Sequence, residues 1–115
     1  MLKVLGYDNI GKTEVIIPPG TIKHVLTKRP KDFDKYFYYI PEVICNPDYY
    51  GKYPNKKDCI ELVKKIYVES NSKGEFVLVG VKINTSKEIL LSSFYSVNWV
   101  KVDSRRKRGR LIEYI

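Results

Sequence analysis

The sequence predicts an α+β fold, because helical patterns come first along the chain and strand patterns follow. From residue 21 to residue 45 apolar side chains recur at helical spacing, whereas three later runs alternate between apolar and polar positions. The turns between those runs are short, which makes neighbouring strands antiparallel. We therefore expect N-terminal helices packed on an antiparallel sheet of about four strands.

The first helix is expected between two breaks in the chain. Residues 18–20, Pro-Pro-Gly, interrupt the preceding strand pattern, and the Thr21 hydroxyl is placed to cap the helix that follows. Pro30 ends this helix, because the residue before a proline avoids the α region. His24 points away from the apolar face of the helix, and a helical wheel places Arg29 on a different side.

The segments around this helix carry weaker signals. Apolar runs at residues 2–7 and 14–17 predict a small hairpin or two edge strands. Residues 31–45 keep helical spacing, and Pro41 should divide them into two helices. Residues 46–58 lack periodicity and are expected to form a surface loop, in which tyrosines alternate with lysines. Such a loop can stack bases and bind phosphates, or its tyrosines pack back on the core.

The expected strands span residues 59–68, 75–84 and 89–97, with turns at residues 71–74 and 86–88. Alternation places Glu61 on the polar side of the first strand. Lys64 falls on the apolar side, where it needs a partner or a route to water. In the last strand, strict alternation puts Leu91 on the same face as Ser93 and Tyr95.

Length, composition and charge limit the number of domains and the class of binding partner. With 115 residues and 43% hydrophobic content, residues 1–115 are expected to form one domain with a single core. The net charge of +8 favours polyanions, with nucleic acid as the first choice and acidic proteins as the alternative. Lysine and arginine crowd residues 101–110, so the tail, residues 101–115, is expected to track a phosphate backbone or to be a disordered solubilising end.

Composition also limits the chemistry and the location. No apolar run is long enough to cross a bilayer, and the first residues lack the apolar region of a signal peptide. This predicts a cytoplasmic protein without a membrane partner. Cys45 and Cys59 are expected to be free thiols, and one histidine with two scattered cysteines gives no metal site. We expect neither a metal nor another cofactor.

Several stretches resemble the phage-borne nuclease domains of the barnase–EndoU–colicin–RelE-like superfamily. The most specific are the proline-bounded helix, with Ile22-Lys23-His24-Val25 and Lys28-Arg29-Pro30, and the turn Asn46-Pro47-Asp48-Tyr49-Tyr50-Gly51. Others are Ile40-Pro41-Glu42-Val43-Ile44, Ile60-Glu61-Leu62-Val63-Lys64, Val79-Gly80-Val81-Lys82, Leu91-Ser92-Ser93-Phe94-Tyr95 and Gly109-Arg110-Leu111. The likeness covers nearly the whole chain, from residue 13 to residue 111.

The resemblance implies a barnase/RelE-like fold and a metal-independent endoribonuclease that cleaves RNA by transesterification through the 2′-hydroxyl. It also implies a prophage or mobile-element toxin or effector, with RNA and a protein inhibitor or phage structural protein as partners. The chain departs from the family pattern at Arg29, where a second histidine is expected, which speaks against two-histidine chemistry. Two alternatives stay open: a catalytically inactive nucleic-acid-binding module and a phage protein-interaction domain.

Cleavage of this kind needs a base, an acid and cations around the phosphate. His24 is the natural proton-transfer group, since histidine titrates near neutral pH. With the resemblance, the catalytic candidates are His24, Arg29, Glu61, Ser93 and Tyr95. The substrate-binding candidates are Lys28, Asn46, Asp48, Tyr49, Lys64, Lys82 and Arg110. The alternative for Glu61 is a strand-face ion pair with Lys82 or Lys65.

Overall fold

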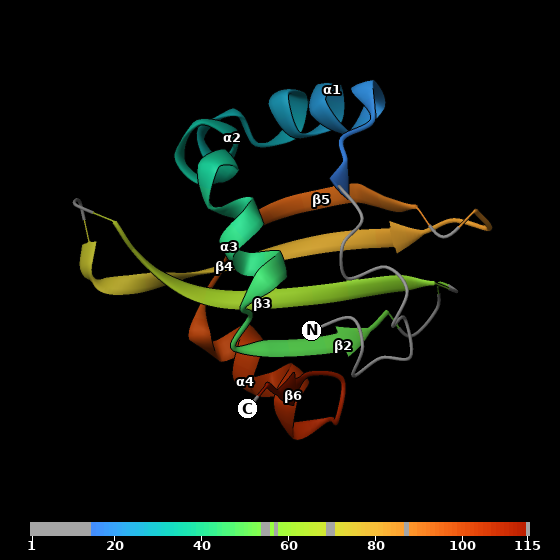
Figure 1. Ribbon diagram of the computed structural model, residues 1–115. Coiled ribbons are helices and arrows are strands. Elements are labelled where there is room, and N and C mark those ends of the chain that lie inside the picture. The colour runs from blue at the N-terminus through green and yellow to red at the C-terminus, as the bar shows by residue number, and fades with distance from the viewer. Residues whose placement is uncertain (1–14, 54–55, 57, 69–70, 87, 115) are drawn as a thin grey trace.

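The computed structural model describes residues 15–53, 56, 58–68, 71–86 and 88–114, and the apolar run expected at residues 2–7 lies outside them. The described residues form a six-stranded sheet with helices on both faces (Figure 1). Its strands are β1 (Val15–Ile16), β2 (Tyr49–Lys52), β3 (Cys59–Val68), β4 (Asn71–Ile83), β5 (Ile89–Val97) and β6 (Ile112–Glu113). They lie in the order β1-β5-β4-β3-β2-β6, and all pairs are antiparallel except the parallel pair β1–β5. The predicted α+β class is confirmed, with a larger sheet than expected.

The N-terminal helices cover one face of the sheet. They are α1 (Pro19–Lys28), α2 (Pro30–Tyr36), the short 3-10 helix η3 (Phe37–Tyr39) and α3 (Ile40–Cys45), which crosses in front of the central strands in Figure 1. Pro30 begins α2 and Pro41 lies in the first turn of α3, where a proline breaks no intrahelical hydrogen bond. The apolar sides of these helices and the facing strand residues form the larger core, which includes Leu62, Val79 and Phe94.

The opposite face carries α4 (Trp99–Lys107) and a smaller core. This core contains Val63, Leu78, Val97, Val102 and Leu111. The Asn98 side chain caps α4 by accepting a hydrogen bond from the Lys101 backbone N–H, 2.9 Å away. The basic tail is therefore a capped helix followed by strand β6, and the expectation of a disordered end is wrong.

Three local expectations differ from the structure. Thr21 does not cap α1, which begins two residues earlier, at Pro19. Its hydroxyl donates instead to the Leu91 carbonyl oxygen of β5, 2.8 Å away. The expected loop at 46–58 contains strand β2, and the whole of the expected turn at 71–74 belongs to β4. Strand β2 is too short to show a period, and its pairing with β3 and β6 stabilises it.

Strand β5 contains a bulge that changes which side chains share a face. Gly80 of β4 pairs with Ser93, whereas the next residue, Val81, pairs with Leu91, so that Ser92 is the extra residue. Leu91 therefore lies in the larger core, while Ser92 and Ser93 both turn to the opposite face. The expectation that Leu91 and Ser93 share a face is wrong for this reason.

The segment after α4 crosses strand β2 at a glycine. A Cβ atom at Gly51 would lie only 1.9 Å from the Arg110 carbonyl oxygen, so the two backbones touch there. This approach leaves Leu111 buried in the smaller core and brings β6 alongside β2. A residue with a side chain at position 51 is incompatible with this arrangement.

Gly51→Ala should therefore lower the free energy of unfolding by about 1–3 kcal/mol, because the added methyl group displaces a packed backbone. Gly20→Ala is the matched control: a Cβ atom there meets nothing within 4 Å, and α1 should gain about 0.4–1 kcal/mol. Urea denaturation of both variants measures the difference. Equal stabilities for Gly51→Ala and the wild type would contradict the close approach.

Candidate active site

A pocket of about 290 Å³ opens on the sheet face that carries α4. Its floor is formed by Glu61, Gly80 and Ser93, which lie side by side on β3, β4 and β5. A Cβ atom at Gly80 would come within 3.0 Å of the Ser93 hydroxyl oxygen. The Ser93 hydroxyl thus lies close to the position that a side chain at Gly80 would take, and the β5 bulge adds the Ser92 hydroxyl to the pocket lining.

Helix α1 and the residue after it supply the opposite wall, with His24 and Arg29. Pro30 ends α1 at Lys28, so Arg29 lies outside the helix with φ of −143°. The helical wheel does not apply to such a residue, and Arg29 therefore lines the same pocket as His24. The Arg29 guanidinium lies over the Tyr95 ring of β5, 4.3 Å from its centroid, a cation–π contact that favours this placement of the arginine.

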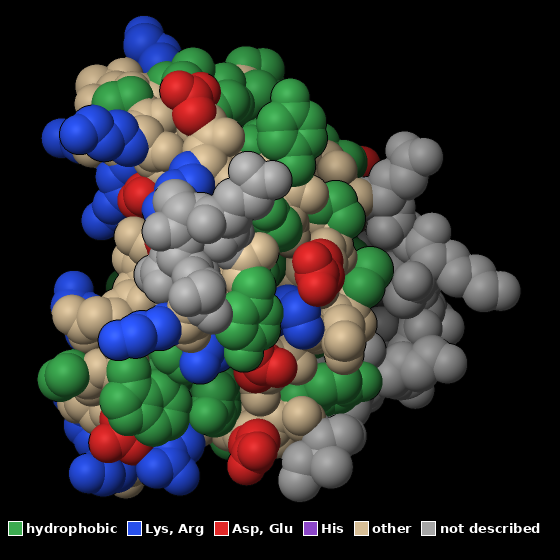
Figure 2. Space-filling model, turned by 90° about the vertical axis from the view of Figure 1, so that its left-hand side faces the viewer, with side chains coloured by type: hydrophobic (Ala, Val, Ile, Leu, Met, Phe, Trp, Pro, Cys, Tyr) green, Lys and Arg blue, Asp and Glu red, His purple; other side chains and the backbone are tan. Residues whose placement is uncertain are grey.

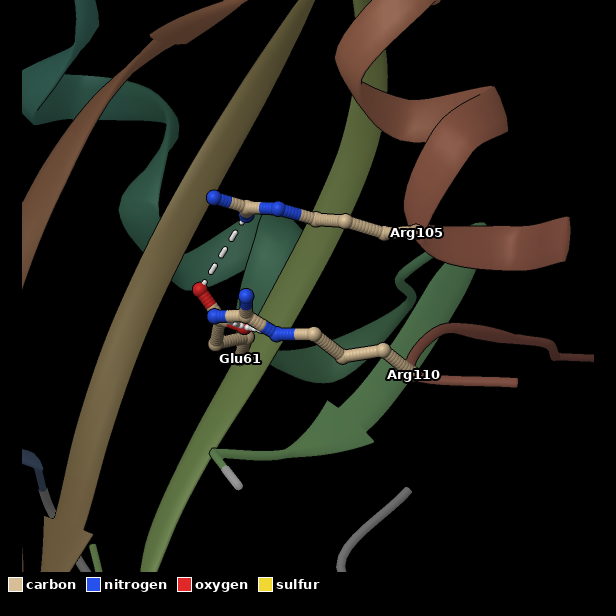
Figure 3. A network of polar contacts seen from close by, with 3 residues as sticks. All are labelled: Glu61, Arg105 and Arg110. Atoms are coloured by element: carbon tan, nitrogen blue, oxygen red, sulfur yellow. Dashed lines mark hydrogen bonds and ion pairs between the residues drawn. The ribbon is translucent and has the colours of Figure 1, made fainter. Parts of the chain in front are cut away.

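Glu61 is buried, with 2% of its surface exposed, and two arginines hold its carboxylate (Figure 3). Arg110 donates to Oε1 from Nη2 at 2.7 Å and from Nε at 3.1 Å. Arg105 of α4 donates to Oε2 from Nη1 at 3.2 Å. Both carboxylate oxygens are therefore engaged by cations, which is the condition under which a charged group is tolerated in the interior.

Comparison with known proteins identifies the family of the chain. The family model described as phage-Barnase-EndoU-ColicinE5/D-RelE like nuclease3 matches residues 1–104. The chain belongs to this family. No curated protein and no solved structure matched the chain. The matched region holds the pocket-lining residues described above, whereas Arg105 and Arg110 lie after it.

The five residues predicted to be catalytic all line this one pocket of the nuclease domain: His24, Arg29, Glu61, Ser93 and Tyr95. The structure brings them together from α1, its C-terminal end, β3 and β5, but their chemical roles stay a prediction. Of the predicted substrate-binding residues, Arg110 is tied to the pocket through Glu61.

The other predicted substrate-binding residues do not line the pocket: Lys28, Asn46, Asp48, Tyr49, Lys64 and Lys82. Three of them join the end of α3 to β3. Lys64 Nζ donates to the Asn46 carbonyl oxygen at 2.9 Å, and Asp48 Oδ2 accepts from the Lys65 backbone N–H at 2.8 Å. Lys64 thus has the partner that its position on an apolar face requires.

Among the residues at or beside the pocket that the sequence-based choice of site residues missed are four with hydroxyl groups or positive charges: Tyr53, Lys56, Ser92 and Arg105. The alternation of tyrosines with lysines in residues 46–58 was a signal for the first two. The basic run of the tail contained Arg105, but nothing local marks it as a partner of Glu61, 44 positions earlier. Ser92 joins the wall only because of the β5 bulge.

The nuclease domain carries much of its positive charge near α4. Figure 2 looks at one end of the sheet and shows Lys and Arg side chains gathered along its left-hand side. Part of this charge is paired, since Asp103 contacts Arg106 at 2.8 Å and Lys107 at 3.2 Å. Hydrogen bonds from Arg106 and then Lys107 lower the pKa of the Asp103 carboxyl.

The described residues hold neither a metal-binding cluster nor a membrane-spanning helix. Among them, no group of three or more His, Cys, Asp or Glu side chains is arranged to hold a metal ion. Within the same part of the chain, no helix has the length and apolar character needed to span a membrane.

Glu61→Leu should destabilise the domain by about 3 kcal/mol, because it leaves the Arg105 and Arg110 guanidinium groups without their carboxylate. We expect the lower end of the range for broken buried pairs, since both arginines keep some access to water. Urea denaturation measures the loss, with Glu113→Leu, at an exposed glutamate, as the control.

The triple variant Glu61→Leu, Arg105→Met, Arg110→Leu should recover most of that stability, because it removes the unpaired cations together with the carboxylate. If Glu61→Leu alone is as stable as the control, the carboxylate does not hold this part of the fold.

Proposed function

We propose that the domain is a metal-independent endoribonuclease that uses the 2′-hydroxyl of RNA as the nucleophile. The observation that carries this proposal is the convergence, in one pocket, of the only histidine of the chain with an arginine, two serine hydroxyls and a tyrosine. These groups supply proton transfer, positive charge and hydrogen bonds to a phosphodiester placed over Gly80.

In the proposed reaction, His24 takes the proton of the 2′-hydroxyl and the 2′-oxygen attacks the adjacent phosphorus. The bond from phosphorus to the 5′-oxygen breaks, which leaves a 2′,3′-cyclic phosphate and a free 5′-hydroxyl. Tyr95 donates the proton that the departing 5′-oxygen takes up, and proton exchange with water restores both side chains. Atoms and charges balance without an added reactant.

The remaining groups would stabilise the charge that builds up on the phosphate. A guanidinium has five N–H donors, so Arg29 can bind a phosphate oxygen while it stays over Tyr95. The Ser93 hydroxyl at the pocket floor can orient another oxygen. Because both Glu61 oxygens are already engaged, we assign Glu61 to positioning its two arginines rather than to taking a proton.

The proposed nucleophile is the 2′-hydroxyl, which DNA lacks, so the proposed reaction can take RNA but not DNA as its substrate. The net charge of +8 suits a polyanionic substrate. The family description names phage nucleases, which supports the proposal that the domain serves a prophage or another mobile element as a toxin or effector.

His24→Ala should lower the rate of RNA cleavage by about 10²–10⁴-fold, the contribution of a positioned acid or base. The assay is incubation with total cellular RNA in the presence of a chelator, with the product ends mapped for 2′,3′-cyclic phosphate. Lys23→Ala, at the exposed neighbouring position on α1, should cleave at close to the wild-type rate.

A wild-type protein that binds RNA but cleaves none would favour the catalytically inactive nucleic-acid-binding module. Binding to RNA that falls steeply with salt indicates contacts to several phosphates. An interaction domain for a phage protein would bind RNA weakly or not at all. An equal loss of cleavage in His24→Ala and Lys23→Ala would remove His24 from the mechanism.

A further inference from the structure

The pocket has an aromatic wall that the proposed chemistry does not use. Tyr53, one residue after β2, lines the pocket and keeps 36% of its surface exposed. The two tyrosines just before it serve the fold, since Tyr49 packs near Trp99 and Tyr50 meets Tyr114 edge to face. Among the described residues of 46–58, Tyr53 is therefore the tyrosine that is open to a ligand in the pocket.

The Tyr53 residue is held in place before any ligand arrives. Its backbone N–H donates to the Cys59 carbonyl oxygen at 2.9 Å, which extends the pairing of β2 with β3 by one residue. The Arg110 guanidinium lies over the Tyr53 ring, 4.7 Å from the centroid, and Glu61 holds that guanidinium through two hydrogen bonds. Glu61, Arg110 and Tyr53 thus form a connected series from the pocket floor to its rim.

A ring backed in this way is a suitable platform for a nucleobase. The Arg110 guanidinium and the Lys56 ammonium both lie over this ring, at 4.7 Å and 5.3 Å from its centroid. Lys56 is exposed and lines the pocket, so its flexible side chain can move off the ring when a base stacks there and can then meet a phosphate of the same strand. Because the platform is held by Arg110, little side-chain freedom is lost on binding.

We propose that Tyr53 is a stacking subsite for one unpaired base of the substrate, next to the phosphate bound over Gly80. The proposal deepens the proposed function and rests on it, because it takes the substrate to be RNA whose phosphate lies in this pocket. A base that stacks on Tyr53 must be unpaired and free of its neighbours. The domain should therefore act on single strands and loops, and select them by base stacking rather than by a base-specific contact.

The test combines a protein substitution with a change in the ligand. The probes are pentanucleotides with 2′-O-methyl sugars, which cannot be cleaved by the proposed mechanism, either with all five bases or with one abasic position moved along the strand. Fluorescence anisotropy at one fixed salt concentration measures their affinity for the wild type, Tyr53→Leu and Tyr53→Phe. Tyr67→Leu is the matched control, because Tyr67 is an exposed tyrosine with a lysine nearby, outside the pocket.

For the wild type, removal of the base at one position should lower the affinity by about 5- to 150-fold, the effect of losing one stacked base. Tyr53→Leu should bind the intact probe more weakly by a similar factor and should no longer respond to the abasic position. Tyr53→Phe and Tyr67→Leu should respond as the wild type does, since each keeps the pocket ring.

The proposal is overturned if the wild type responds to no abasic position, or if Tyr53→Leu responds as strongly as the wild type. An equal loss of affinity for intact and abasic probes in Tyr53→Leu would also overturn it. These measurements need no cleavage, so they are separate from the His24 experiment. If the wild type responds to an abasic position but cleaves no RNA, the subsite is supported and the proposed reaction is rejected. If it cleaves RNA but responds to no abasic position, the reaction is supported and the subsite is rejected.

Discussion

The clasp of Glu61 by Arg105 and Arg110 joins the centre of the sheet to the segment that follows β5. A carboxylate in the middle of a sheet with 2% exposure is stable only when cations neutralise it, and here both cations come from at least 44 positions further along the chain. Helix α4, the crossing at Gly51 and strand β6 place them there. The two ion pairs of Glu61 therefore contribute both to the packing of this segment and to the charge beside the pocket.

Two glycines in the strands shape the face of the sheet that carries the pocket. A row of residues across the sheet runs from Gly51 through Glu61 and Gly80 to Ser93. The two glycines in it have no side chain, so atoms of other residues can approach the strands there. At Gly51 the space is filled by the backbone of residue 110, and at Gly80 the Ser93 hydroxyl oxygen lies 3.0 Å from the point that a Cβ atom would occupy. The bulge at Ser92 then turns two hydroxyls toward the same space. A glycine and a bulge in a strand thus serve as site-forming features.

Sequence patterns predicted the parts of this structure that depend on local chemistry. The alternation over residues 59–68 and 89–97 gave the bounds of β3 and β5, and Pro30 and Pro41 marked the helix divisions. Strand β2 was missed because pairing on both sides, rather than its four residues, determines it.

Residues of the site whose positions depend on distant parts of the chain were likewise not predicted correctly. The direction of Arg29 could not come from a helical wheel, since the residue lies past the end of α1. Arg105 was missed because its contact with Glu61 joins distant parts of the chain. The pocket is built from contacts between distant parts of the chain. Local patterns could therefore predict several of its residues but not how these residues are arranged.

The hydrogen bond from Thr21 to the Leu91 carbonyl oxygen couples the helix that bears His24 to the strand residue beside the bulge. This contact joins the two walls of the pocket to each other. A strand of nucleic acid would have to enter from the open side, by bending to the shape of a cavity that is already formed.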